Sequence, residues 1–175
     1  MKCINKMFLF KSDEEKKADR LKDLSYENTP EFSFNGKIFF AKVLDVYDGD
    51  TITITVKVDG EYFRTNCRLN GLDSPELKSH DEEEKKAARM SRKHLMFLLT
   101  KEKIGVDVSR SEIQKICGEI NSIVNVKCLD FDKYGRLLID IWVGGIHINQ
   151  KMIEDGFAGP YDGGTKGDWR LYYKH

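Results

Sequence analysis

The chain has 175 residues, of which 40% are hydrophobic and 33% are charged, proportions that are ordinary for a soluble globular protein. Its 29 basic residues are balanced by 29 acidic ones. This balance excludes a protein that coats duplex DNA through a strongly basic surface, so any contact with nucleic acid must be local.

Residues 1–36 are expected to form an N-terminal extension, in which acidic and basic residues are equal in number and provide no basic arm for DNA. The apolar run Met7-Phe8-Leu9-Phe10 is too short for a secretory signal, and no other stretch has the length of a membrane span. We therefore expect an intracellular, cytosolic protein with no membrane partner. Ser12 followed by Glu15 is a capping-box pattern and predicts a short helix near 13–25, either packed on the domain or part of a loose tail.

The remaining residues, 37–175, are expected to form the domain itself. Periodicity, charge order and turn residues predict strands at 38–46, 51–58 and 62–69, a helix at 81–103, a short helix at 110–117, strands at 123–129 and 137–143, and a last helix at 147–155. Asp59-Gly60 is a hairpin signal, and Gly118 and Gly156 are expected to end the last two helices. This order predicts a mainly β, α+β fold: a five-stranded barrel of the OB-fold type with packed helices.

Charged residues gather at the ends of the predicted strands. The groups are Asp48-Gly49-Asp50-Thr51, Arg68, Asp73-Ser74-Pro75-Glu76 and Asp132-Lys133-Tyr134-Gly135-Arg136. Each group alone is more often a simple turn. Together they indicate chemistry, because the carboxylates would repel a phosphate and the arginines would repel a metal ion. A metal-bound phosphodiester satisfies both sets at once.

These motifs resemble those of the thermonuclease family, the staphylococcal-nuclease-like domains, in order and approximate spacing over about residues 37–161. Asn149-x-x-Met152-Ile153, with Tyr161 after it, extends the match. The resemblance implies a calcium-dependent nuclease that hydrolyses phosphodiester bonds of DNA and RNA. Its partners would be DNA, RNA or both, with single-stranded or frayed regions preferred; no protein partner is predictable.

The resemblance also implies the calcium ligands, which would be the carboxylates of Asp50 and Asp73 and the backbone carbonyl of Ser74. Pro75 would hold Ser74 extended and so direct that carbonyl. Three protein oxygens leave calcium undersaturated, so waters and a substrate phosphate would complete its shell. Ligation by oxygen alone favours calcium or magnesium over zinc.

Catalytic and nucleotide-binding roles follow from the same resemblance. Arg68 and Arg136 would stabilise the transition state, because a guanidinium can donate two parallel hydrogen bonds to a phosphate. Glu76 would be the general base for the attacking water. Lys133, Tyr134 and Tyr161 would contact the nucleotide, although packing is an equally common role for the two tyrosines.

Two non-catalytic alternatives are a binding module that holds single strands and a scaffold domain of the same family. A binding module gains nothing from carboxylates beside its arginines. A degenerate scaffold would be expected to lack at least one of Asp50, Arg68, Asp73, Glu76 and Arg136, and all five are present. The enzyme is therefore favoured.

The four cysteines have no zinc-ligand spacing and indicate reduced thiols; they are Cys3, Cys67, Cys117 and Cys128. The sequence leaves one disulfide open, between Cys67 and Cys128.

Overall fold

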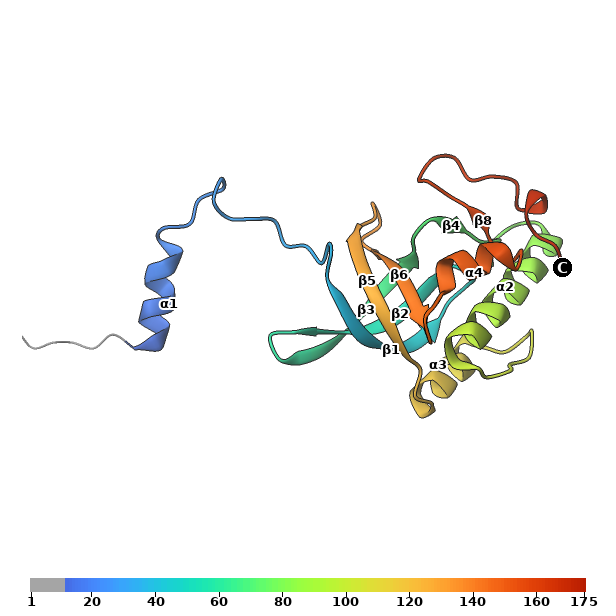
Figure 1. Cartoon of the computed structure of the whole chain (residues 1–175), viewed down its shortest axis with the longest axis horizontal. Coiled ribbons are helices and arrows are strands. Elements are labelled where there is room, and N and C mark those ends of the chain that lie inside the picture. Colours follow the sequence, from blue (N-terminus) through green and yellow to red (C-terminus); the bar gives the residue numbers. More distant parts are fainter. Residues whose placement is uncertain (1–11) are drawn as a thin grey trace, which may run out of the picture. The chain divides into compact units, whose positions relative to one another are not determined.

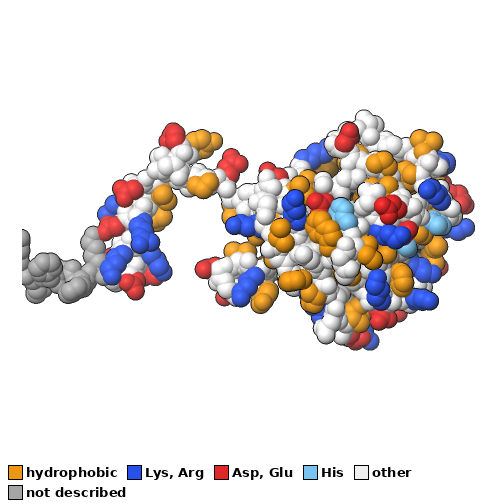
Figure 2. All heavy atoms as spheres, in the orientation of Figure 1, with side chains coloured by type: hydrophobic (Ala, Val, Ile, Leu, Met, Phe, Trp, Pro, Cys, Tyr) orange, Lys and Arg blue, Asp and Glu red, His pale blue; other side chains and the backbone are white. Residues whose placement is uncertain are grey.

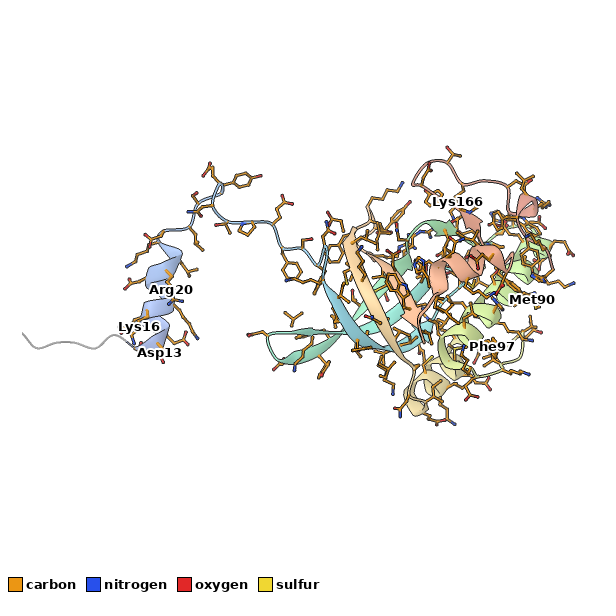
Figure 3. The ribbon with its side chains drawn as sticks, in the orientation of Figure 1. Asp13, Lys16, Arg20, Met90, Phe97 and Lys166 are labelled. Atoms are coloured by element: carbon orange, nitrogen blue, oxygen red, sulfur yellow. The ribbon has the colours of Figure 1, made fainter. Side chains whose placement is uncertain are left out.

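The computed structural model describes residues 12–175, and the chain divides into two compact units, Met1–Ser33 and Phe34–His175. The first unit contains helix α1 (Asp13–Leu21) (Figure 1). The predicted capping box is present: the Ser12 hydroxyl accepts from the Glu15 amide at 3.2 Å, and the Glu15 carboxylate accepts from the Ser12 amide at 2.8 Å. The helix buries no residue and is supported by local ion pairs such as Lys16–Asp13 at 3.2 Å (Figure 3), and it ends before the predicted residue 25.

The second unit is built on a closed barrel of five strands (Figure 1). These are β1 (Ile38–Val46), β2 (Thr51–Val58), β3 (Glu61–Leu69), β5 (Ile123–Phe131) and β6 (Leu137–Val143). They pair in the order β3-β2-β1-β5-β6, and a parallel pairing of β3 with β6 closes the barrel. The predicted OB-fold-type barrel is confirmed, and the ends of its strands lie within two residues of their predicted positions.

Three helices accompany the barrel: α2 (Glu82–Thr100), α3 (Arg110–Glu119) and α4 (Ile148–Glu154). Gly156, at φ +75°, follows α4 as predicted. The prediction for Gly118 was wrong: α3 continues through it, because hydrogen bonding extends to the Ile120 amide, which donates to the Ile116 carbonyl at 3.1 Å.

Short elements that the sequence pattern did not predict complete the unit. They are β4 (Leu72–Asp73), β7 (Ile146–His147), β8 (Gly159–Pro160) and the 3₁₀ helix η1 (Trp169–Leu171). Strand β4 pairs with β8, so the segment that carries Asp73 is held against the chain that follows α4.

The core fills the barrel and the space beneath α2, where Leu95 and Met96 are fully buried. Cys67, Cys117 and Cys128 are buried free thiols, so no Cys67–Cys128 disulfide forms; Cys3 lies outside the described residues. Across residues 12–175, no helix combines the length and the apolar character needed to cross a bilayer. In the view of Figure 2, basic and acidic side chains are interspersed over the exposed face of the second unit.

Asn149 is a buried amide that fastens α4 to the barrel. Its Oδ1 accepts from the Ile141 amide at 3.0 Å, and its Nδ2 donates to the carbonyls of Asn70 and Ile139, each at 2.9 Å. The side chain thereby provides partners for the Ile141 amide and the Asn70 carbonyl, and a second donor for the Ile139 carbonyl, which also accepts from the Asn70 amide at 2.9 Å.

We expect Asn149→Ala to lower the free energy of unfolding by about 2–4 kcal/mol, since each buried backbone group left unsatisfied costs roughly 1–3 kcal/mol. Chemical denaturation followed by circular dichroism measures this. Asn121→Ala, at an exposed loop position, is the matched control and is expected to change stability by less than about 0.5 kcal/mol. An Asn149→Ala protein as stable as the wild type would contradict the anchoring role.

Candidate active site

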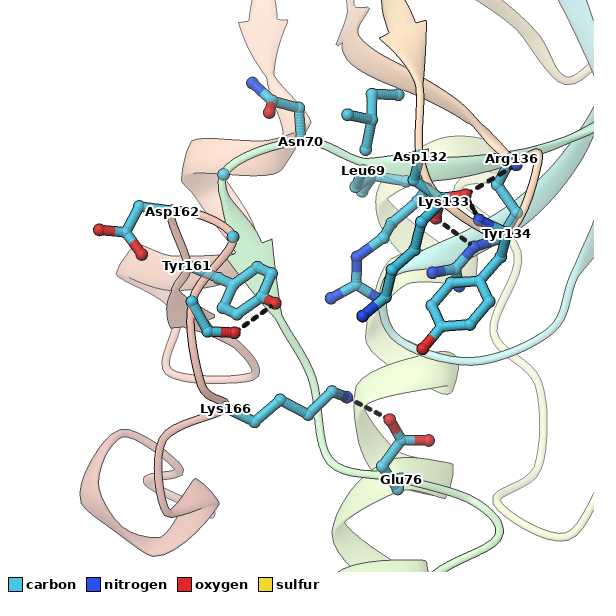
Figure 4. Close-up of a pocket in the computed structure, with 15 residues that line it drawn as sticks. Leu69, Asn70, Glu76, Asp132, Lys133, Tyr134, Arg136, Tyr161, Asp162 and Lys166 are labelled. Atoms are coloured by element: carbon cyan, nitrogen blue, oxygen red, sulfur yellow. Dashed lines mark hydrogen bonds and ion pairs between the residues drawn. The ribbon is translucent and has the colours of Figure 1, made fainter.

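One pocket of about 920 Å³ contains most of the predicted site residues (Figure 4). Those that line it are Arg68, Glu76, Lys133, Tyr134, Arg136 and Tyr161. They come from the end of β3, the segment after β4, the β5–β6 turn and the segment after β8. The three residues predicted to bind metal, Asp50, Asp73 and Ser74, are buried beside the pocket, and Asp50 and Asp73 form ion pairs with Arg68, which lines it.

Gly49 allows the β1–β2 turn to lie directly on the segment after β4. A Cβ atom at this position would stand 2.7 Å from the Cβ atoms of both Ser74 and Ser91, closer than side chains approach one another. Asp50 then lies close enough for its Oδ2 to accept from the Ser74 amide at 3.3 Å. The turn and the Asp73-Ser74 segment, far apart in the sequence, thus meet at one point.

Arg68 joins the two predicted carboxylate ligands. Its Nη1 is 2.8 Å from Asp50 Oδ2, and its Nη2 is 2.7 Å from Asp73 Oδ1 and 3.3 Å from the Leu72 carbonyl oxygen. Only 8% of Arg68 is exposed. Burial opposes its charge, but Asp50 and Asp73 outweigh burial and raise the pKa of the guanidinium. Arg68 is therefore held rigidly, with its planar group between two acids.

Arg136 is oriented by the turn in which it lies. Its Nε donates to Asp132 Oδ2 at 2.8 Å, and its Nη1 donates to the Thr51 hydroxyl at 3.3 Å. That hydroxyl in turn donates to Asp50 Oδ1 at 2.7 Å. Hydrogen bonds thus connect Arg136 to Asp50 through Thr51. An arginine predicted to bind phosphate and a predicted metal ligand therefore belong to one network.

The predicted nucleotide-binding tyrosines occupy two different segments around the pocket (Figure 4). The Tyr134 ring is largely exposed and lies 5.5 Å from the Arg136 guanidinium and 5.2 Å from the Lys133 ammonium. The Tyr161 ring lies 5.5 Å from the Arg68 guanidinium, and its hydroxyl donates to the Gly164 carbonyl at 2.9 Å. Each tyrosine therefore stands beside one of the two arginines.

Asp48 is a fourth acid of this cluster, to which sequence reasoning assigned no role although it lies in the Asp48-Gly49-Asp50-Thr51 motif. Its Oδ1 accepts from the Asp50 amide at 3.0 Å. Burial, together with the negative charges of Asp50 and Glu76, raises the pKa of Asp48 to about 8. Burial is the main cause of this raised pKa, and the neighbouring carboxylates add to it.

Lys166 is the second residue that sequence reasoning missed, and no motif marked it. Its ammonium lies 2.9 Å from Asp73 Oδ1 and contacts the Glu76 carboxylate (Figure 4). Burial disfavours this charge, but the hydrogen bonds to Asp73 and Glu76 outweigh burial and raise the pKa of Lys166.

The charges of the cluster fit a divalent cation. Four carboxylates, those of Asp48, Asp50, Asp73 and Glu76, gather here. Arg68 and Lys166 form ion pairs with Asp50, Asp73 and Glu76, and Arg92 lies close enough to Asp48 to interact with its charge. Over residues 12–175, no three or more acidic, histidine or cysteine side chains are gathered as a ready-made metal cage. The donors expected from the sequence are instead two carboxylates and a backbone carbonyl, an all-oxygen set suited to calcium or magnesium in an open site.

Asp48→Asn is expected to stabilise the cation-free protein. The folded pKa of Asp48 lies above its unfolded value, so folding retains a proton that the unfolded chain releases, and stability falls as pH rises from about 4 towards 8. Asparagine does not carry this penalty and keeps an oxygen for the Asp50 amide. The variant should match the wild type near pH 4 and exceed its Tm at pH 8 by at least about 2–4 °C. Thermal scans of both proteins in EGTA across this pH range measure the difference in Tm. Equal Tm values at every pH would contradict the destabilisation by ionised Asp48.

The staphylococcal nuclease homologue family matches residues 66–168, which contain Arg68, Glu76 and Arg136. The chain belongs to this family. The match begins within β3 and includes all of the pocket-lining segments described above.

Two relatives are similar to this chain over about two thirds of its length. An uncharacterized protein of Bacillus anthracis is 34% identical over 117 residues, which are 67% of this chain and 45% of the relative. A thermonuclease of Staphylococcus hyicus is 29% identical over 121 residues, 67% of this chain and 56% of the relative. The chain thus spans about half the length of the relatives it matches, and the match supports a nuclease-type function.

Proposed function

We propose that this protein is a calcium-dependent nuclease that hydrolyses phosphodiester bonds of DNA and RNA at the pocket beside Arg68 and Arg136. The observation that carries the proposal is the joining of clustered carboxylates and two oriented arginines in one hydrogen-bonded network. A cation and a phosphate together complement that set; either alone complements half of it. The thermonuclease of Staphylococcus hyicus among the relatives supports the same chemistry.

Asp50, Asp73 and the Ser74 carbonyl would hold calcium, which when bound would neutralise charge on the phosphate. Asp50 is prepared for this role, because the Thr51 hydroxyl and the Ser74 amide fix its two oxygens at 2.7 and 3.3 Å. The low exposure of these ligands, 3% for Asp50 and 5% for Asp73, keeps their charges in a setting where electrostatic interactions are strong.

Arg136 would bind the phosphate oxygens and stabilise the charge that develops on them. Asp132 binds Nε, so the guanidinium is oriented before the substrate arrives and needs no reorganisation during the reaction. Arg68 would act next to the metal ligands, with which it forms ion pairs. Glu76 would accept the proton of the attacking water; with 48% of its side chain exposed, it is open to solvent from which that water comes.

Tyr134, Lys133 and Tyr161 would receive the nucleotide. The exposed Tyr134 ring offers a face on which a base can stack, which favours unpaired over duplex strands. The chain has no excess of basic residues, so affinity would depend on this pocket and not on a basic surface. We further propose that residues 37–175 carry the activity without the extension 1–36, because every candidate site residue lies beyond Lys37.

A cleavage assay on end-labelled single-stranded DNA and RNA tests the proposal. The full chain should cleave both in calcium, more slowly in magnesium, and not at all in EGTA. The double variant Asp50→Asn/Asp73→Asn, purified in parallel, should be inactive in every arm. Undiminished cleavage in EGTA would overturn the metal assignment, and binding without cleavage in calcium would favour a non-catalytic binding module.

A further inference from the structure

Lys166 belongs to a C-terminal segment that is folded back onto the acid cluster. The segment is anchored by Tyr172, whose ring packs so closely on Gly159 that a Cβ there would stand 2.3 Å from it. Gly159 is in turn the β-sheet partner of Asp73. Arg170 forms an ion pair with Asp81, the N-cap of α2. These contacts place Lys166 beside Asp73 as part of the fold.

The Tyr172 hydroxyl gives independent evidence that this segment shares the electrostatics of the acid cluster. It is buried and has no hydrogen-bond partner within the described part of the chain. Burial raises the pKa of this hydroxyl, and the negative charges of Asp73 and Asp50 raise it further. Both Lys166 and Tyr172 are therefore close enough to the acid cluster to sense its charge.

Asp73 Oδ1 has no capacity left for another partner. It accepts from Arg68 Nη2 at 2.7 Å and from Lys166 Nζ at 2.9 Å, which uses both lone pairs of the oxygen. A calcium ion on either oxygen of Asp73, at roughly 2.3–2.6 Å, would share this one carboxylate with the ammonium. Two cations on one carboxylate repel, so Asp73 cannot hold calcium and Lys166 together without a penalty.

Of the two cationic side chains on Asp73, Lys166 is the one that can leave. Arg68 is held by Asp50 and by the Leu72 carbonyl as well, and only 10% of its side chain is exposed. The Lys166 side chain is 43% exposed and comes from residues 162–168, an exposed stretch without helix or strand. Figure 3 shows Lys166 on this C-terminal stretch. The Lys166 side chain can therefore move away from Asp73 and Glu76 without displacing η1 or Tyr172.

We infer that Lys166 is a built-in competitor of the divalent cation: its ammonium holds Asp73 and Glu76 in the cation-free protein and leaves them when the cation binds. This inference rests on the proposed function for the identity of the cation site. It adds that the cation must displace a residue of this chain, so that the calcium affinity is set partly by a loop outside the metal ligands. It adds also that the exchange releases the Glu76 oxygen that Lys166 holds.

Isothermal calorimetry of calcium binding to the full chain tests the exchange. Lys166→Met removes the ammonium but keeps the length of the side chain, and should tighten calcium binding roughly 3- to 10-fold, since two partly exposed ion pairs no longer compete. Lys166→Arg keeps the charge and should bind like the wild type. Lys151→Met is the matched control, because it removes a lysine paired with Asp155, outside the acid cluster, and should leave calcium affinity unchanged.

A second readout follows the loop itself. Calcium should accelerate cleavage after Lys166 by the lysine-specific protease Lys-C in the wild type, because the freed side chain becomes accessible, while cleavage after other lysines stays constant. Circular dichroism confirms that each variant is folded.

The outcomes separate the two proposals. Tighter calcium binding in Lys166→Met, and in neither Lys166→Arg nor Lys151→Met, supports both the calcium site and the competition by Lys166. Equal calcium affinity in the wild type and in Lys166→Met would overturn the competition and leave the calcium site standing. No calcium binding by any variant would overturn the calcium site and the competition with it.

Discussion

Arg136→Ala is expected to lower kcat by roughly 10²–10³-fold with a much smaller change in KM, because a donor oriented towards developing charge contributes mainly in the transition state. Asp132 fixes this guanidinium through Nε at 2.8 Å, so its terminal nitrogens are oriented before the substrate binds. Arg136→Lys should recover little of the loss, since an ammonium cannot donate the two parallel hydrogen bonds. Steady-state kinetics on a labelled oligonucleotide in saturating calcium measures both constants.

The control for the Arg136 variants is Arg64→Ala, which removes an exposed arginine of β3 outside the pocket and should leave kcat unchanged. Arg136 is a cleaner probe than Arg68. Removing Arg68 would also take away the one ion-pair partner that Asp50 and Asp73 share, and destabilisation would mix with the catalytic effect. Wild-type turnover in Arg136→Ala would show that the two-arginine mechanism does not operate in this protein.

Glu76→Gln is expected to lower kcat by roughly 10²–10⁴-fold, the usual contribution of a general base, while calcium affinity changes by less than about threefold. Glutamine keeps the shape of the side chain but cannot accept the proton of the attacking water. Glu76 is a candidate base and not a candidate ligand, so kcat should fall while calcium affinity changes little.

Asp50→Asn is the counterpart of Glu76→Gln and should weaken calcium binding by roughly tenfold or more, because a charged ligand oxygen is lost. Activity in Asp50→Asn should return in part at high calcium, whereas that of Glu76→Gln should not. The measurements are kcat and calcium affinity for both variants. If Glu76→Gln loses calcium as severely as Asp50→Asn, then Glu76 is a ligand and its assignment as the base is wrong.

Much of the fold could be predicted because its signals are local. Alternation of β-branched residues located the five barrel strands, and the Asp59-Gly60 turn correctly joined β2 to β3. The prediction at Gly118 failed because one glycine near the end of a helix costs only about 1 kcal/mol, which the remaining hydrogen bonds of α3 can offset. The two-residue strands β4 and β8 have too few residues for any periodicity to appear.

The candidate site could be predicted only where its residues lie in contiguous motifs. Asp48 lies in such a motif, but its burial and its closeness to Glu76 depend on how the β1–β2 turn packs, which the motif does not specify. Lys166 lies 90 residues beyond Glu76 in a loop without a motif, and it reaches the acids because Tyr172 packs on Gly159. Contacts of this kind depend on tertiary packing and leave no pattern along the chain.

The central claim is that one pocket binds a divalent cation and a phosphate ester together, and linked binding tests it most directly. Thymidine 3′,5′-bisphosphate is titrated into the full chain by calorimetry, once in saturating calcium and once in EGTA. We expect binding at least tenfold tighter in calcium, and by reciprocity the nucleotide should tighten calcium binding by the same factor. Equal affinity in the two buffers, or no binding in either, would contradict a shared site for cation and phosphate.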